Sequence, residues 1–161
     1  MANLIDESIK IIRLADLTPG EQAMVAKGII AIILADGVVT TSELQYLKRH
    51  CRVFLEDDSV ITIDRLKEYI ANKEKPEFWY LNISESAKVH YMLKVFVKAI
   101  YADRQKAQSE IDVYFNIGKL MGISFYVLSE VLKIESDKIL LQERENRMLE
   151  DLKILLKRNI K

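Results

Sequence analysis

Two pairs of acidic residues share one spacing in this 161-residue chain, and they are its best candidates for metal chemistry. Asp36 is followed seven residues later by Glu43, and Asp103 is followed seven residues later by Glu110. Four carboxylates that converge without a matching group of bases spread into solvent, raise a pKa or hold a cation. Oxygen ligands alone favour Ca²⁺ or Mg²⁺ over zinc or copper. The four side chains are therefore the candidate ligands of a divalent-cation site.

A structural interpretation of the same acids stays open on the sequence alone. Glu43 can close a capping box with Thr40, in which each side chain bonds the backbone N–H of the other residue. Ala107 stands at the corresponding place before Glu110 and cannot cap, so this interpretation is weaker there. The two aspartates follow helices, where an aspartate commonly bonds the backbone N–H groups of a turn. The spacing is not that of an EF-hand loop, which needs acids at alternating positions.

Other residues with reactive side chains are poorly placed for chemistry. His50 and Cys51 are adjacent, so on a helix they point about 100° apart and do not readily share one ion or form a nucleophile pair. His90 is the only other histidine, which leaves too few ligands for zinc. The chain also lacks the glycine-rich phosphate loops and the GxSxG nucleophile motif. A hydrolase based on paired carboxylates would lack a second catalytic group near the acids, so we expect no enzyme activity.

The composition favours a globular cytoplasmic protein. The chain has 24 Lys and Arg against 24 Asp and Glu, and half of its residues are hydrophobic. Zero net charge argues against nucleic-acid binding, which needs a surplus of bases. The single cysteine suits a reducing compartment, and the first residues lack the pattern of a signal peptide. The longest uncharged apolar run, residues 28–35, is far shorter than the ~20 residues that cross a bilayer. We expect one domain over residues 1–161, without membrane insertion.

Helical periodicity runs through nearly the whole chain and predicts an all-α bundle of seven to nine helices. The sequences from Thr18 to Glu21 and from Thr40 to Glu43 are capping boxes that start helices, and Gly122 is a helix-terminating glycine. We expect Gly37 to adopt positive φ, since a helix, a sharp turn and a capping box follow one another there. The predicted helices cover about residues 3–16, 18–35, 40–55, 60–72, 84–100, 107–121, 124–133 and 136–159.

The last predicted helix, about residues 136–159, is amphipathic. Apolar residues recur every seven positions at Ile134, Leu141, Met148 and Leu155, and a second apolar stripe runs beside them near the C-terminus. The intervening positions are mostly polar, whereas a coiled coil needs both sets apolar. We expect the C-terminal half of this helix to lie across the bundle, with residues 142–147 in solvent. A homodimer contact is the alternative.

An internal repeat relates the two acidic pairs. When the chain is laid over itself at an offset of 67 residues, each copy reads as a helix, an Ala-Asp, a short turn and a helix with Ser-Glu in its first turn. The matched positions include Lys27 with Lys94, Ala35 with Ala102, Asp36 with Asp103, Ser42 with Ser109 and Glu43 with Glu110. Two such helix hairpins can pack around a pseudo-twofold axis, so we predict that the two acidic motifs lie close in space.

The segment from Leu34 to Glu43, LADGVVTTSE, resembles the signature of the tellurite-resistance TerB family, whose fold also occurs as the N-terminal domain of DjlA-type membrane co-chaperones. The segment from Tyr101 to Glu110 falls where that family has its second acidic motif, although Arg104 replaces the glycine and Lys106 adds a cation. The resemblance covers about residues 20–135. It implies an all-helical bundle, a divalent-metal site among the acids and no established enzyme activity.

The resemblance therefore implies a non-enzymatic bacterial protein of stress response or tellurite resistance. Its expected cofactor is Ca²⁺ or Mg²⁺, held by Asp36, Glu43, Asp103 and Glu110. Its expected partners are other proteins, among them membrane-associated resistance components, and no nucleic acid. The alternative is a co-chaperone-like protein-interaction module in which the acids are purely structural.

Overall fold

Helices α2, α3, α5, α6 and α7 build the computed structural model, which describes residues 12–35, 40–51, 68, 71–72, 83, 85–102 and 107–159. Their bounds are Pro19–Ile33, Thr41–Cys51, Ser86–Ile100, Gln108–Leu120 and Phe125–Asn159, and a short 3-10 turn, Leu14–Asp16, precedes them. The described residues form no strand, so the prediction of an all-α fold is confirmed. Within these ranges the α-helices number five, fewer than the predicted seven to nine. The predicted helix at 60–72 lies largely outside the described residues, as does the part of the 3–16 helix before residue 12.

Helix α2 begins at the predicted capping box. The Thr18 N–H donates to Oε1 of Glu21 at 2.9 Å, and the Glu21 N–H donates to Oγ1 of Thr18 at 3.2 Å. Pro19 occupies the first turn, where its missing N–H leaves no helical bond unmade. Residues 23–30 are all buried, so α2 lies at the centre of the bundle, as its broad apolar surface predicted.

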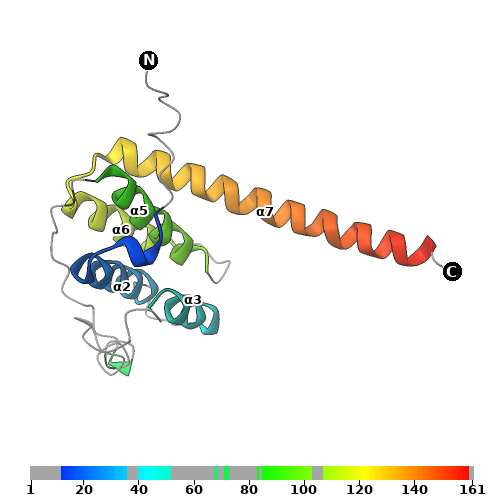
Figure 1. Ribbon diagram of the computed structural model, residues 1–161, viewed down its shortest axis with the longest axis horizontal. Helices are drawn as coiled ribbons and strands as arrows, with labels where there is room; N and C mark the ends of the chain where they lie inside the picture. The colour runs from blue at the N-terminus through cyan, green and yellow to red at the C-terminus, as the bar shows by residue number, and fades with distance from the viewer. Residues whose placement is uncertain are drawn as a thin grey trace, which may run out of the picture.

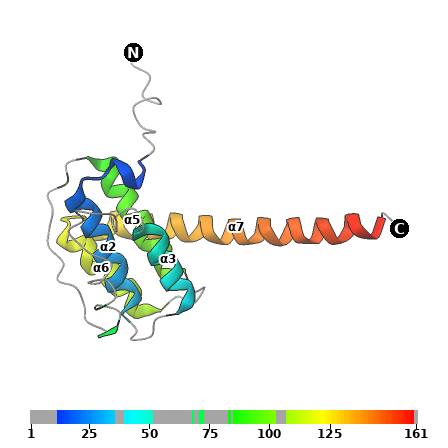
Figure 2. The ribbon, with the colours of Figure 1, turned by 60° about the horizontal axis from the view of Figure 1, so that its bottom comes forward.

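Helices α2 and α5 pack side by side and run in the same direction (Figure 2). Near their N-termini, Nζ of Lys88 lies 3.0 Å from Oε1 of Glu21. Farther along both helices, the ring of the fully buried Phe96 lies directly over Gly28. The partner of each residue is thus 67 or 68 positions away. As a result, the C-terminal ends of α2 and α5 lie at one end of the bundle.

Helices α3 and α6 return from that end and flank the central pair. Both α3 and α6 contact α2 and α5. The hydroxyl of Tyr46 on α3 donates to the backbone carbonyl of Val95 on α5 at 2.7 Å. On α6, the hydroxyl of the fully buried Tyr114 donates to the carbonyl of Leu128 on α7 at 2.8 Å. These two bonds tie each outer helix to a neighbour across the core.

The turn between α6 and α7 follows the prediction. Gly122 has a φ of 76°, a left-handed conformation that favours glycine. Ser124 then caps α7, because its Oγ accepts from the Val127 N–H at 3.3 Å. A sharp reversal followed at once by a cap lets α7 pack back onto α5 and α6.

Helix α7 corrects the prediction of two separate C-terminal helices. It is continuous from Phe125 to Asn159, without the break expected near Ser136. Ser136 does not cap there; its Oγ donates to the carbonyl of Leu132 at 2.6 Å, one turn back in the same helix. The physical reason is that the sequence after Gly122 contains neither glycine nor proline to end a helix.

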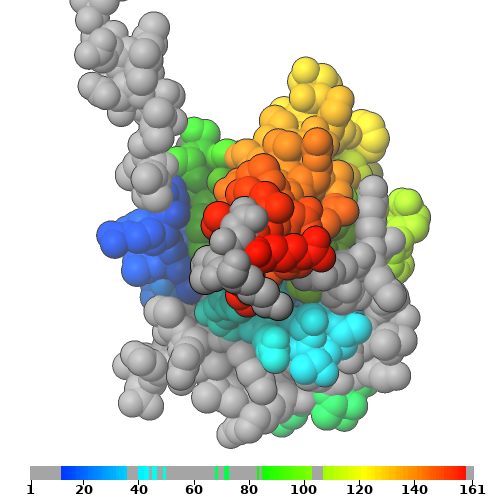
Figure 3. Space-filling view, turned by 90° about the vertical axis from the view of Figure 1, so that its right-hand side faces the viewer, coloured from blue at the N-terminus to red at the C-terminus, as the bar shows by residue number. Residues whose placement is uncertain are grey.

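The C-terminal half of α7 does not lie across the bundle, so that prediction is wrong. The helix projects away from the other four as a single long arm (Figures 1 and 2), and its C-terminal end stands in front of the bundle in Figure 3. Every side chain from Arg144 to Arg158 is exposed. Residues 142–147 were expected in solvent, and all but the partly buried Glu143 are exposed. No helix in the described part of the chain combines the length and apolarity needed to cross a membrane.

Candidate functional site

Glu43 sits in the first turn of α3 and is fully buried. The Thr40 N–H donates to its Oε2 at 2.8 Å, and the Glu43 N–H donates to Oγ1 of Thr40 at 3.2 Å. The capping box predicted from the sequence is therefore present. The bond from the Thr40 N–H fixes the position of Oε2 of Glu43. Glu43 therefore has a structural role in capping α3, and this role does not depend on a cation.

Glu110 is buried to the same extent in the first turn of α6, but no capping box accounts for it. The N-cap residue of α6 is Ala107, whose side chain makes no capping hydrogen bond. Burial of a carboxyl group carries a desolvation penalty that polar or charged neighbours must offset. Glu43 in α3 and Glu110 in α6 are thus both buried in the first turn of their helix, and the capping box is described for Glu43.

The two glutamates belong to the two helices that follow the shared end of α2 and α5. Asp36 and Asp103 lie outside the described residues, as does Gly37, so the predicted proximity of the two motifs and the backbone of Gly37 stay predictions. Among the side chains that the structure describes, three or more His, Cys, Asp or Glu residues do not gather into a group that could hold a metal ion. The described half of the candidate site is therefore the glutamate pair.

The ion pair between Glu21 and Lys88 was not predicted from the sequence. Burial raises the pKa of Glu21, but bonds from the Thr18 N–H and hydroxyl and from the Lys88 ammonium together lower it more, so the net pKa is below its ordinary value. The bond to Glu21 raises the pKa of Lys88. The two residues are 67 positions apart, the offset at which the sequence was predicted to repeat, and that coincidence was the available signal.

The described histidine and tyrosine side chains do not form a catalytic group. His90 lies at an exposed position on α5, and the side chains of His50 and Cys51 are outside the described set. Burial raises the pKa of Tyr114, and the Glu135 carboxylate raises it further. Tyr114 therefore stays protonated at neutral pH and serves as the hydrogen-bond donor described above.

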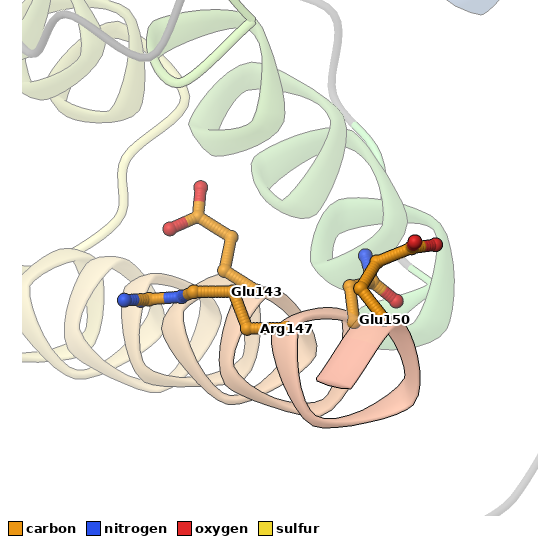
Figure 4. A pocket seen from close by; sticks show the side chains of 4 residues that line it. Glu143, Arg147 and Glu150 are labelled. Carbon is orange, nitrogen blue, oxygen red and sulfur yellow. The ribbon is translucent and has the colours of Figure 1, made fainter. Parts of the chain in front are cut away.

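Two surface hollows lie along α7. A hollow of about 350 Å³ is lined by residues of α6 and α7 and by Tyr101, whose hydroxyl is 2.7 Å from Oγ of Ser136. A second, of about 400 Å³, has Glu143, Asn146, Arg147 and Glu150 on its wall (Figure 4). These four residues occupy one polar face of a single helix. In the first hollow the hydroxyl of Ser136 bonds the Tyr101 hydroxyl and the Leu132 carbonyl, so its described hydrogen bonds are with neutral groups.

A row of exposed apolar side chains lies on the projecting part of α7. Five large side chains share one face of the helix, and each is 44–60% exposed. We call them the α7 stripe: Met148, Leu149, Leu152, Leu155 and Leu156. Their spacing of one, four, seven and eight residues is that of a single helix face. A contiguous apolar face of this kind on a protein surface usually marks a contact surface.

Comparison with known proteins adds no relative to this picture. No family model, curated protein or solved structure significantly matches this chain. The functional argument therefore rests on two features of the chain itself, the buried glutamate pair and the α7 stripe.

Proposed function

We propose that this chain is a non-enzymatic, TerB-like helical domain that acts by binding other proteins through helix α7. The observation that carries this proposal is the α7 stripe, five large apolar side chains held in solvent on a helix that extends beyond its own bundle. A helix normally turns such a face toward a core. Here the described bundle provides no core for it.

The size of the stripe is sufficient for a partner contact. Full burial of a leucine or methionine side chain is worth about 1.5–3 kcal/mol, and these five are about half exposed. Covering them would contribute roughly 4–7 kcal/mol before the entropy cost of association is subtracted. The entropy cost of association is about 4 kcal/mol or more, so the contact is weak and reversible unless apolar side chains of the partner add to it. The same calculation supports the co-chaperone-like alternative, which differs only in the identity of the partner.

The test is a matched pair of substitutions on the arm. Leu152→Glu places a charge in the α7 stripe, whereas Ile154→Glu places the same charge at a similarly exposed apolar residue off the stripe. Both variants leave the bundle intact because neither side chain packs on it. In cells that make the protein, we expect cross-linked partners to be lost with Leu152→Glu and kept with Ile154→Glu. Equal retention by both variants would contradict a role for the stripe.

A divalent-cation site is the second candidate, and the burial of Glu43 and Glu110 at matching positions in the first turns of α3 and α6 favours it. In this proposal the two helix hairpins are copies of one repeat, and Asp36 and Asp103 join Glu43 and Glu110 around Ca²⁺ or Mg²⁺. The contact between Glu21 and Lys88, at the repeat offset, supports such an arrangement. In the sequence Asp36 follows α2 and Asp103 follows α5, and these two helices end at the same side of the bundle.

Thermal melting in Ca²⁺ or Mg²⁺ tests this candidate. A cation that binds only the folded state should add about 2.7 kcal/mol at a hundredfold excess over its Kd. We expect Glu110→Gln and Asp36→Asn to abolish that gain, while Glu43→Gln weakens it and keeps most of its cap. Asp112→Asn, which removes an exposed acid on the same helix as Glu110, is the control and should respond like the wild type. If neither ion changes the melting temperature, the acids are structural and the cation site is refuted.

Tellurite resistance or stress response is the cellular role that the resemblance implies. A strain lacking the protein should be more sensitive to tellurite, and the Leu152→Glu variant should fail to restore growth. If Leu152→Glu restored growth as fully as Ile154→Glu does, tellurite resistance would not depend on the α7 contact.

A further inference from the structure

We propose that the α7 stripe binds a second copy of this chain, in an antiparallel pair centred between residues 153 and 154. This inference rests on the proposed role of α7 as a contact surface and names its partner. The side chains around the arm of one copy complement those of a second copy in one orientation and one register.

The stripe divides into a central line and one flank. Met148, Leu152 and Leu155 follow one another at spacings of four and three, which is the alternation of a short coiled-coil seam. Leu149 and Leu156 stand beside this line on one side. The other side carries charges at the same interval of seven residues, Arg144, Asp151 and Arg158, and all of them are exposed.

An antiparallel pair brings like flank against like flank. If Leu152 packs opposite Leu155 of the partner subunit, the apolar flank places Leu149 against the partner's Leu156, and each contact occurs twice by symmetry. The charged flank then places Asp151 beside the partner's Arg158, again twice. The four leucines of this face therefore meet leucines of the partner subunit, and Met148 lies at each end of the seam. Both ion pairs join opposite charges.

Other arrangements lack this match. In a parallel pair, Glu145 on the central line would face its own copy, and Asp151 would lie against the partner's Leu156. Moving the antiparallel register by one heptad toward the bundle would set Asp151 against its own copy and Arg144 against the partner's Arg158. This move, and equally a move by two heptads, would also bury Glu145 in the seam. Like charges at these places oppose association, so charge selects the one register.

The geometry of the arm leaves room for this pair. The centre of the contact lies about 13 residues beyond Leu140, or about 20 Å along the helix at 1.5 Å per residue. The two bundles would therefore stand at opposite ends of the paired arms, about 40 Å apart along the helix axis. The seam itself is only about 11 residues long, so the interface is small and the dimer is a weak, reversible one.

Sedimentation equilibrium of the full chain up to about 1 mM, a range that covers weak complexes, tests the proposal. We expect the wild type and Ile154→Glu to associate to dimers and Leu152→Glu to stay monomeric. Asp151→Arg and Arg158→Asp should each weaken the dimer by roughly tenfold, because two attractive pairs become repulsive. Circular dichroism of each variant verifies that the helices are retained.

The charge exchange decides the orientation. The double variant Asp151→Arg/Arg158→Asp should recover wild-type dimerisation, because each pair is restored with its signs reversed. In parallel arms Asp151 and Arg158 do not meet, so the double variant would not recover dimerisation. A double variant whose loss of dimer affinity equals the sum of the two single losses therefore overturns the proposal. A wild type that stays monomeric also overturns it. If Leu152→Glu still loses its cellular partners in that case, the partner is a different protein, and the proposed function stands without this inference.

Discussion

Gly28→Ala is the substitution that most directly tests how the bundle is aligned. Gly28 is buried where α2 meets α5, and a Cβ built there would lie 2.6 Å from Cζ of Phe96 and still closer to Cε1. That ring is fully buried, so it has no open space into which it can swing. The close approach is what sets α2 and α5 in their common register, with their C-terminal ends on one side.

The expected magnitude is the difference of two opposing effects. Alanine gains about 1 kcal/mol over glycine inside a helix. Overpacking a well-filled core costs about 1–3 kcal/mol, and the distance to Phe96 puts this site toward the upper end. We expect a net loss of about 1–2 kcal/mol in the free energy of unfolding, which lowers Tm by about 2–8 °C in a protein of this size.

Urea unfolding followed by circular dichroism measures this loss. Gly20→Ala, in the first turn of the same helix, is the control, because it makes the same chemical change at a partly buried position. Phe96→Leu in the Gly28→Ala background should cost less than Phe96→Leu alone, since the smaller side chain relieves the clash. If Gly28→Ala stabilises the protein as an exposed helical glycine would, the close packing of α2 on α5 is refuted.

Three further results are expected. Tyr46→Phe removes the hydrogen bond to the Val95 carbonyl and should cost about 0.5–1.5 kcal/mol in urea unfolding, and no change would show that water replaces this bond. Gly122→Ala forces alanine into a left-handed conformation and should lower stability by about 1 kcal/mol or more, with a smaller loss for Gly122→Asn as the check. Because the pKa of Glu21 is depressed, its stabilising effect is complete above its ordinary pKa of 4.5 and is lost as pH falls below that value. Glu21→Gln should therefore reduce the fall of Tm as the pH drops below about 4.5, and an unchanged fall would mean that the bonds from Thr18 and Lys88 have little effect.

Local signals in the sequence predicted local structure well. The capping boxes at Thr18 and Thr40 form as expected, and Gly122 ends α6 with positive φ. These features depend on residues three or four positions apart, so the chain itself carries the information. The broad apolar surface of α2 likewise predicted its central place, because a helix that is apolar on most sides must be surrounded.

Predictions that depended on distant packing did less well. The break expected near Ser136 was inferred from a serine that resembles a cap, but that hydroxyl bonds one turn back within an uninterrupted helix. The arm was expected to cover the bundle because its apolar stripe needed a partner, and the sequence does not say whether that partner lies in the same chain. The prediction of an acidic site stays a prediction: Glu43 and Glu110 are buried, but Asp36 and Asp103 lie outside the described residues.

Because α7 extends beyond the bundle, hydrogen exchange of its backbone amides can report whether a partner covers the helix. The amides of the buried helix α2 should exchange slowly, because deuterium reaches them only when the core around the helix opens. Residues 144–158 have exposed side chains throughout, and a helical segment of that length is marginally stable in water on its own. Their amides should therefore exchange rapidly in dilute solution and become protected in proportion to the fraction of arms that are covered. Protection along this one segment would then report, residue by residue, when a partner is bound and which turns of the helix it covers.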